Sequence, residues 1–179
     1  MYTAAQVLFR STDDGRSWQT ISPDLSGADP AATGCTDDTP VERATACGYG
    51  TLFAVAPSPL KDGLVWVGTN NGRVYLTRNG GEDWQNVTPA GLEDWSKVNL
   101  IDASAADTET AYLAIDRHRL DDFSPRAYVT HDGGKSWREI GHGLPAGAYI
   151  KVVRQDPAQP GLLYAGTSRG VSVSFDDGE

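Results

Sequence analysis

The residues with the greatest chemical potential lie in one short segment, 116–126. Its first seven residues offer an imidazole, two guanidinium groups and three carboxylates, contributed by Asp116, Arg117, His118, Arg119, Asp121 and Asp122. An imidazole exchanges a proton near neutral pH, a guanidinium group holds anions, and a carboxylate accepts hydrogen bonds from hydroxyl groups. The segment therefore predicts a ligand-binding site with His118 as its pH-sensitive contact. The alternative is a rigid strut, in which Asp121 and Asp122 pair with the neighbouring arginines.

Catalytic chemistry has weaker support in the sequence. A glycoside hydrolase needs two carboxylates that face each other across a sugar, and spacing alone does not place two of these acids in that way. The chain contains no nucleophile elbow, phosphate-binding glycine loop or set of metal ligands. We therefore assign no catalytic residue and expect neither a metal nor a cofactor.

Trp95 is a further candidate because it lies in a connection, 91–95, between two apolar stretches. An exposed indole there could stack on a sugar or on a partner's side chain, whereas a buried one would pack against a neighbouring element. Both alternatives remain open at this point.

Two cysteines, Cys35 and Cys47, bracket a polar segment. They are too far apart for a Cys-x-x-Cys redox motif, and the segment lacks further metal ligands. They form either a disulfide that closes a loop, if the protein is exported, or two free thiols.

Composition places the chain among globular β-proteins. It has 179 residues, 39% of them hydrophobic, with 20 Gly, 10 Pro and 5 Trp, a composition that suits strands joined by many turns. The formal net charge of −9 argues against nucleic acid as a partner. No stretch is long and apolar enough to span a membrane, and the first residues do not resemble a signal peptide, so the chain is either cytosolic or lacks its beginning.

A turn motif, Ser/Thr-x-Asp-x-Gly-x-x-Trp, recurs along the chain. Its copies are Ser11, Asp13, Gly15 and Trp18; Thr77, Asn79, Gly81 and Trp84; Thr130, Asp132, Gly134 and Trp137; and Ser174, Asp176 and Gly178 without a Trp. Asp or Asn accepts hydrogen bonds from the backbone of the turn, and Gly adopts a positive φ. We therefore interpret the acids as structural and the Trp side chains as part of the core.

Alternating apolar runs around these motifs predict repeated units. Strands are expected at 51–56, 64–68, 73–77 and 84–88, and again at 97–104, 111–115, 127–130 and 137–140. The resulting division is half a unit with two strands at 1–22, a loop at 23–48, full units at 49–90 and 97–142, and an incomplete unit at 148–179. A four-stranded meander of about forty residues is typical of a β-propeller blade, so the expected fold is an all-β partial propeller with further blades missing from this chain.

Propeller topology sorts the connections onto two faces. The turn motifs join the third and fourth strands on one face. The connections between blades, and those between the second and third strands of a unit, lie on the other. Segment 116–126 is predicted to be a loop inserted between the second and third strands of its unit. The Cys35–Cys47 loop, segment 91–95 and segment 116–126 should therefore share a face. The runs 51–56, 97–104 and 149–155 are expected to be the innermost strands.

The motifs resemble the Asp-box, or BNR repeat, of sialidases, xyloglucanases, sortilin-type receptor domains and photosystem II assembly factors. The phrases Val65-Trp66-Val67-Gly68-Thr69, His118-Arg119-Leu120-Asp121-Asp122 and Leu163-Tyr164-Ala165-Gly166-Thr167 are similar to bacterial propellers labelled sortilin-like or glycosyl-hydrolase-like. This resemblance implies a non-catalytic scaffold that binds a protein, peptide or glycan through its loop-rich face, in a full-length protein exported to the periplasm or beyond. The alternative that it implies is part of a carbohydrate-active hydrolase. The arginine cluster and Tyr nucleophile of a sialidase are not recognisable.

Overall fold

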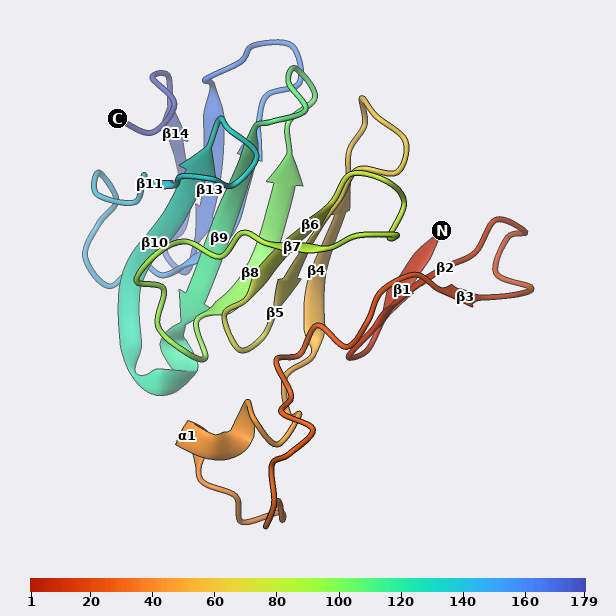
Figure 1. Cartoon of the computed structure of the whole chain (residues 1–179). Helices are drawn as coiled ribbons and strands as arrows, with labels where there is room; N and C mark the ends of the chain where they lie inside the picture. Colours follow the sequence, from red (N-terminus) through yellow and green to blue (C-terminus); the bar gives the residue numbers. More distant parts are fainter.

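The computed structural model describes all 179 residues and contains four antiparallel sheets that follow one another along the chain (Figure 1). The first has β1 (Tyr2–Ala4), β2 (Leu8–Arg10) and β3 (Gln19–Thr20); the second has β4 (Leu52–Pro57), β5 (Val65–Thr69), β6 (Val74–Thr77) and β7 (Gln85–Asn86). The third has β8 (Lys97–Ala103), β9 (Ala111–Arg117), β10 (Asp122–Thr130) and β11 (Arg138–Glu139); the fourth has β12 (Ile150–Gln155), β13 (Leu163–Thr167) and β14 (Gly170–Ser174). Within each sheet every strand pairs with the next strand in sequence, so each sheet is a meander. The all-β prediction is confirmed, and we call the sheets the first to fourth blades.

Helical structure is limited to a four-residue helix, α1 (Val41–Ala44), and a 3₁₀ turn, η1 (His118–Leu120). The only α-helix thus lies in the long segment 23–48 that was expected to be a loop. No helix has the length and apolar character needed to cross a membrane.

The first blade has three strands, where the sequence predicted two. β1 pairs with β2, with Tyr2 opposite Arg10 and Ala4 opposite Leu8. Three residues are too few to show an alternating pattern, which is why β1 was missed. Figure 1 shows the first and fourth blades at opposite ends of an open row.

The core consists of apolar side chains between successive blades. The largest cluster joins the second and third blades and includes Trp66, which is fully buried and meets Trp137 edge to face with ring centroids 6.1 Å apart. The strands β4, β8 and β12 border one groove, which makes them innermost as expected. Blade-on-blade packing thus sets the positions of all connections.

The hydrogen bonds of the third turn motif explain its sequence. The Thr130 hydroxyl donates to Asp132 Oδ1 over 2.8 Å and accepts from the Gly134 N–H over 2.9 Å. The same carboxylate accepts from the Ser136 N–H over 2.9 Å and from its hydroxyl over 2.6 Å. Gly134 has a φ of 81°, and a Cβ there would lie 2.6 Å from the Cβ of Val87. Glycine is required both by its own backbone and by the neighbouring blade.

The other motifs repeat this geometry. Asp13 and Asp176 accept from the hydroxyls of Ser11 and Ser174, over 2.8 and 2.7 Å. Asn79 accepts from the Thr77 hydroxyl over 3.0 Å. These side chains therefore act within their own turns, as the sequence predicted.

The motif tryptophans fasten each blade to the one before it. The Trp84 indole N–H donates to the carbonyl of Ile21 over 3.0 Å, and that of Trp137 donates to the carbonyl of Val87 over 2.7 Å. Trp18 differs, because its side chain is 41% exposed. The prediction that Trp18 belongs to the core is wrong, since no strand of the structure covers that side of the first blade.

Candidate functional site

Segment 116–126 is a continuation of the third blade and not an inserted loop, which corrects the sequence prediction. Strand β9 runs to Arg117, and β10 already begins at Asp122. The 3₁₀ turn η1 closes this hairpin with Asp121 in the left-handed region at a φ of 59°. The candidate residues are therefore held on a long hairpin that reaches beyond the other blades.

Arg117 and Asp122 belong to a brace at the base of this hairpin. The Arg117 guanidinium pairs with Glu93 and with Asp122, at 2.5 and 3.2 Å. It also donates to the carbonyl of Asp94 and to the hydroxyl of Ser96. These contacts tie the hairpin to segment 91–95, as the strut alternative predicts for Asp122.

Asp116 and His118 join the third blade to the fourth. The Asp116 side chain is 2% exposed; one oxygen accepts from His118 Nδ1 over 2.6 Å and the other from the ammonium group of Lys151. Burial raises the pKa of Asp116, but the hydrogen bonds from Lys151 and His118 outweigh burial and leave that pKa below its usual value. Because an ionised carboxylate only accepts, His118 Nδ1 carries a proton and Nε2 is the nitrogen left for other contacts.

The ring of His118 is oriented by an aromatic neighbour. It stacks on Tyr149, with ring centroids 4.7 Å apart and planes 12° apart, while Phe123 is tilted against the same ring. Arg119 and Asp121 are exposed and form no ion pair. Asp121 therefore takes no part in the strut that the sequence suggested for it.

Trp95 packs against the disulfide loop. Its backbone has a φ of 61°, and its indole N–H donates to the carbonyl of Val41 in α1 over 3.0 Å. The sequence left open whether this side chain is free to stack on a ligand. The structure instead places it as a link between segment 91–95 and segment 23–48.

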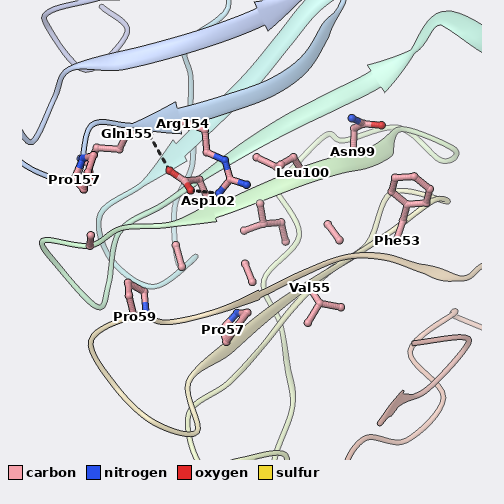
Figure 2. A pocket seen from close by; sticks show the side chains of 15 residues that line it. Phe53, Val55, Pro57, Pro59, Asn99, Leu100, Asp102, Arg154, Gln155 and Pro157 are labelled. Atoms are coloured by element: carbon pink, nitrogen blue, oxygen red, sulfur yellow. Dashed lines mark hydrogen bonds and ion pairs between the residues drawn. The ribbon is translucent and has the colours of Figure 1, made fainter. Parts of the chain in front are cut away.

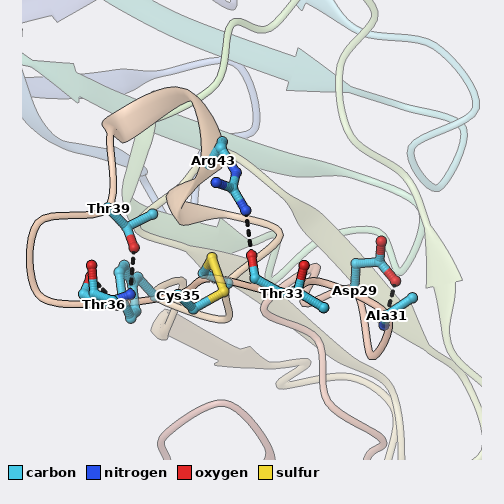
Figure 3. The surroundings of a disulfide bond; sticks show 9 residues. Asp29, Ala31, Thr33, Cys35, Thr36, Thr39 and Arg43 are labelled. Carbon is cyan, nitrogen blue, oxygen red and sulfur yellow. Dashed lines mark hydrogen bonds between the residues drawn. A yellow bond between two sulfur atoms is a disulfide. The ribbon is translucent and has the colours of Figure 1, made fainter.

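The loop itself is closed by a Cys35–Cys47 disulfide, so the disulfide alternative is the one observed (Figure 3). Arg43 donates to the carbonyl of Thr33 across the loop. Figure 1 shows α1 and the tip of the β9–β10 hairpin on the same side of the row of blades. The three segments thus share one face, and we call it the loop-rich face.

A groove along the innermost strands is a feature that the sequence analysis missed. It has a volume of about 640 Å³ and is lined by β4, β8 and β12 (Figure 2). An ion pair between Asp102 of β8 and Arg154 of β12 lies among the lining residues. At one end lies Phe53, which is 51% exposed and is the second residue of β4.

Lys97 lies over Phe53, with its ammonium nitrogen 3.7 Å from the ring centroid. Loss of hydration lowers the pKa of Lys97; the attraction of Asp116 opposes this shift, while repulsion from Lys151 and Arg119 adds to it. The charge of Lys97 at the end of the groove therefore interacts with the charges around the Asp116–His118 pair. The sequence prediction placed binding residues only in the connections between strands. It missed Phe53 and Lys97 because they lie within β4 and β8.

No protein-family model and no curated protein sequence matches the chain. Among solved structures, an ancestral GH74 enzyme superposes with a TM-score of 0.69 at 20% identity, over 99% of this chain and 21% of the enzyme. YCF48 from Cyanidioschyzon merolae superposes with a TM-score of 0.52 at 23% identity, over 71% of this chain and 34% of YCF48. A structure of YCF48 bound to D1 peptide superposes with a TM-score of 0.54 at 18% identity, over 71% of this chain and 38% of that one. The chain spans about a fifth to two fifths of these propellers, and the likeness shows the fold: a partial β-propeller.

Proposed function

We propose that the chain is part of a non-catalytic propeller scaffold that binds a protein, peptide or glycan through its loop-rich face. The proposal rests on one observation: the acids on that face are paired with cations, whereas some of its cations have no acidic partner. The acids Asp116 and Asp122 are already paired with cations, whereas Lys97 and Arg119 form no ion pair and Phe53 is exposed. Such a surface offers contacts to a ligand without an acid and a base facing each other. A solved propeller of similar fold is described as bound to a peptide, which supports the peptide form of the proposal.

The second candidate is part of a glycoside hydrolase, since almost the whole chain superposes on a GH74 enzyme. A hydrolase of this type needs one carboxylic acid with a raised pKa to protonate the leaving group. Both Asp116 and Asp122 have pKa values below the usual range, and each accepts bonds from cations. Both are ionised at neutral pH, so this chain's hairpin supports binding better than acid catalysis.

The disulfide supports one further part of the proposal, which concerns location. Disulfides persist mainly in oxidising compartments. We therefore propose that the full-length protein is exported to the periplasm or beyond. Formation of the Cys35–Cys47 bond in exported but not in cytosolic material would be the supporting result.

Two measurements test the proposed function. The protein should release no reducing sugar from a panel of polysaccharides, and release from any one of them would contradict a non-catalytic role. The labelled protein should also be captured by a subset of spots on peptide and glycan arrays. Capture by neither array would contradict the binding role.

Replacing Arg119 and Asp121 together with Ala separates binding from support. Neither side chain forms an ion pair or belongs to the Arg117 brace, so a binding role predicts lost capture at an unchanged melting temperature; His118 is left in place because it donates to the buried Asp116. A supporting role predicts a lower melting temperature, with capture falling only in proportion to the unfolded fraction. Trp18→Ala, remote from this face and exposed, is the matched control.

A further inference from the structure

Positive charge gathers at one end of the groove, although the formal net charge of the protein is −9. Lys97 of β8 lies over the groove residue Phe53 and stands opposite Asp116 of β9 in the strand ladder, and Lys151 of β12 donates to the Asp116 carboxylate. Loss of hydration lowers the pKa of Lys97, and repulsion from Lys151 and from Arg119 of η1 lowers it further. The acid among them, Asp116, is buried and already accepts bonds from Lys151 and His118. This end of the groove therefore has more positive than negative charge.

Aromatic faces hold the two ammonium groups at this end. Lys97 lies over Phe53, and the Lys151 nitrogen is 4.9 Å from the ring centroid of Tyr149. A ring face attracts a cation but does not neutralise it, so Lys97, which forms no ion pair, keeps its N–H donors for a ligand, whereas Lys151 already donates to Asp116. The site thus combines the unused donors of Lys97 with exposed apolar surface, as a ligand with both carboxylate and apolar groups would require.

The shape of the groove indicates how such a ligand would lie. Beyond Phe53 the wall continues with Val55 and Pro57 of β4 and with Leu100 of β8 (Figure 2). β4 has six residues, which correspond to about 20 Å at the rise of a strand. The Arg154 side chain, which borders the same groove, is 55% exposed and could donate to carbonyl groups. An extended segment of about six residues fits this length.

We infer that the loop-rich-face end of the groove binds an acidic peptide segment, with its carboxylates at Lys97, Arg119 and Lys151 and an apolar side chain on Phe53. This inference rests on the proposed binding function and names the ligand class. A small inorganic anion would leave Phe53 and the groove wall uncovered. A neutral glycan would leave the cations without partners.

The test uses two fluorescein-labelled hexapeptides. One alternates Glu and Leu and belongs to the inferred ligand class, and the other alternates Gln and Leu and is the neutral control. Fluorescence anisotropy with the protein should show the Glu peptide binding at least about tenfold more tightly than the Gln peptide, as expected from losing one charge-assisted contact. Raising the salt from about 0.01 M to about 0.15 M should weaken the Glu peptide's binding, because exposed charges are screened. Equal binding of the two peptides, or no binding of the Glu peptide, would overturn the inference.

Charge-matched variants locate the site. Lys97→Gln should weaken binding of the Glu peptide by about tenfold at an unchanged melting temperature, because Lys97 forms no ion pair. Lys61→Gln and Lys135→Gln remove the same charge from exposed positions outside the groove and should leave binding unchanged. Phe53→Ala should also weaken binding, since it removes the apolar platform. Equal effects of all three lysine variants would mean a general charge effect and would contradict the assigned site.

The two levels of proposal fail in different ways. If the Gln peptide binds as well as the Glu peptide, or array peptides bind without any preference for acids, the ligand class is wrong and the binding scaffold stands. If neither array captures the protein and neither hexapeptide binds, the proposed function fails as well.

Discussion

Replacing Trp137 with Ala should destabilise the protein strongly, because this side chain joins two blades. The ring is half-buried in the main core cluster and lies edge to face on the fully buried Trp66. Its N–H donates to the Val87 carbonyl over 2.7 Å. The replacement removes apolar packing, an aromatic contact and a hydrogen bond in one step.

The expected magnitude follows from these three losses. A buried Trp replaced by Ala costs about 3–5 kcal/mol of unfolding free energy. Within that range, the edge-to-face contact accounts for about 0.5–1.5 kcal/mol and the hydrogen bond for about 1 kcal/mol. Because the Trp137 ring is only half-buried, we expect the lower end, about 3 kcal/mol. For a domain of this size this corresponds to a fall in melting temperature of about 6–12 °C.

Urea and thermal unfolding followed by circular dichroism measure this change, with Trp18→Ala as the matched control. Trp18 occupies the same position of its motif but is 41% exposed, so its replacement should cost less than about 1 kcal/mol. Trp137→Phe keeps a ring and loses the donor to the Val87 carbonyl, and should fall between the two. If Trp137→Ala costs no more than Trp18→Ala, the role assigned to the motif tryptophan in joining blades is wrong.

Three further predictions concern the turn motif and the loop. Gly134→Ala should destabilise by more than about 1 kcal/mol, because φ is positive and the new Cβ meets Val87, whereas Gly143→Ala, with open space around it, should be nearly neutral in the same unfolding assay. Hydrogen bonds from Ser136 lower the pKa of Asp132 to about 2. Since the unfolded value is about 4, the stabilisation from the ionised carboxyl is complete above about pH 4 and is lost as the pH falls towards 2. Unfolding of Asp132→Asn should depend less steeply on pH across that range, while Asp13, whose pKa is also lowered to about 2, keeps its own contribution. Reducing the disulfide should lower stability by about 3 kcal/mol, measured as the difference in unfolding free energy with and without reductant.

Much of the fold could be predicted because its signals are local. The eight positions of the turn motif contain both the side chains that form its hydrogen bonds and the glycine that it requires. Between the motifs, apolar and polar residues alternate in the runs that form strands. β1 was not predicted because a strand of three residues is too short to show an alternation of apolar and polar residues. Segment 116–126 was predicted to be a loop because its charges hide the strand pattern, yet β9 and β10 continue through it and bury Asp116 against Lys151.

The groove end could not be predicted from sequence, because its residues lie far apart along the chain. Phe53, Lys97 and Lys151 each belong to a different blade, and their meeting depends on how the innermost strands converge. Alternation shows which face a strand residue occupies but not which residues of other blades share that face. Only the packing of successive blades makes these three positions neighbours.

The strut alternative for segment 116–126 is observed at Arg117 and Asp122, whereas the binding-site alternative stays a prediction that concerns His118 and Arg119 of the same hairpin. Arg117 forms ion pairs with Asp122 and with Glu93 of segment 91–95. Replacing Arg117 or Asp122 should therefore destabilise the hairpin itself. Arg119 has no such partner, and His118 has one nitrogen committed to Asp116 and one free. A rigid base that carries unpaired groups at its tip can hold those groups in place before a ligand arrives, which lowers the entropy lost on binding. The brace is therefore an argument for a binding site on this hairpin and not against one.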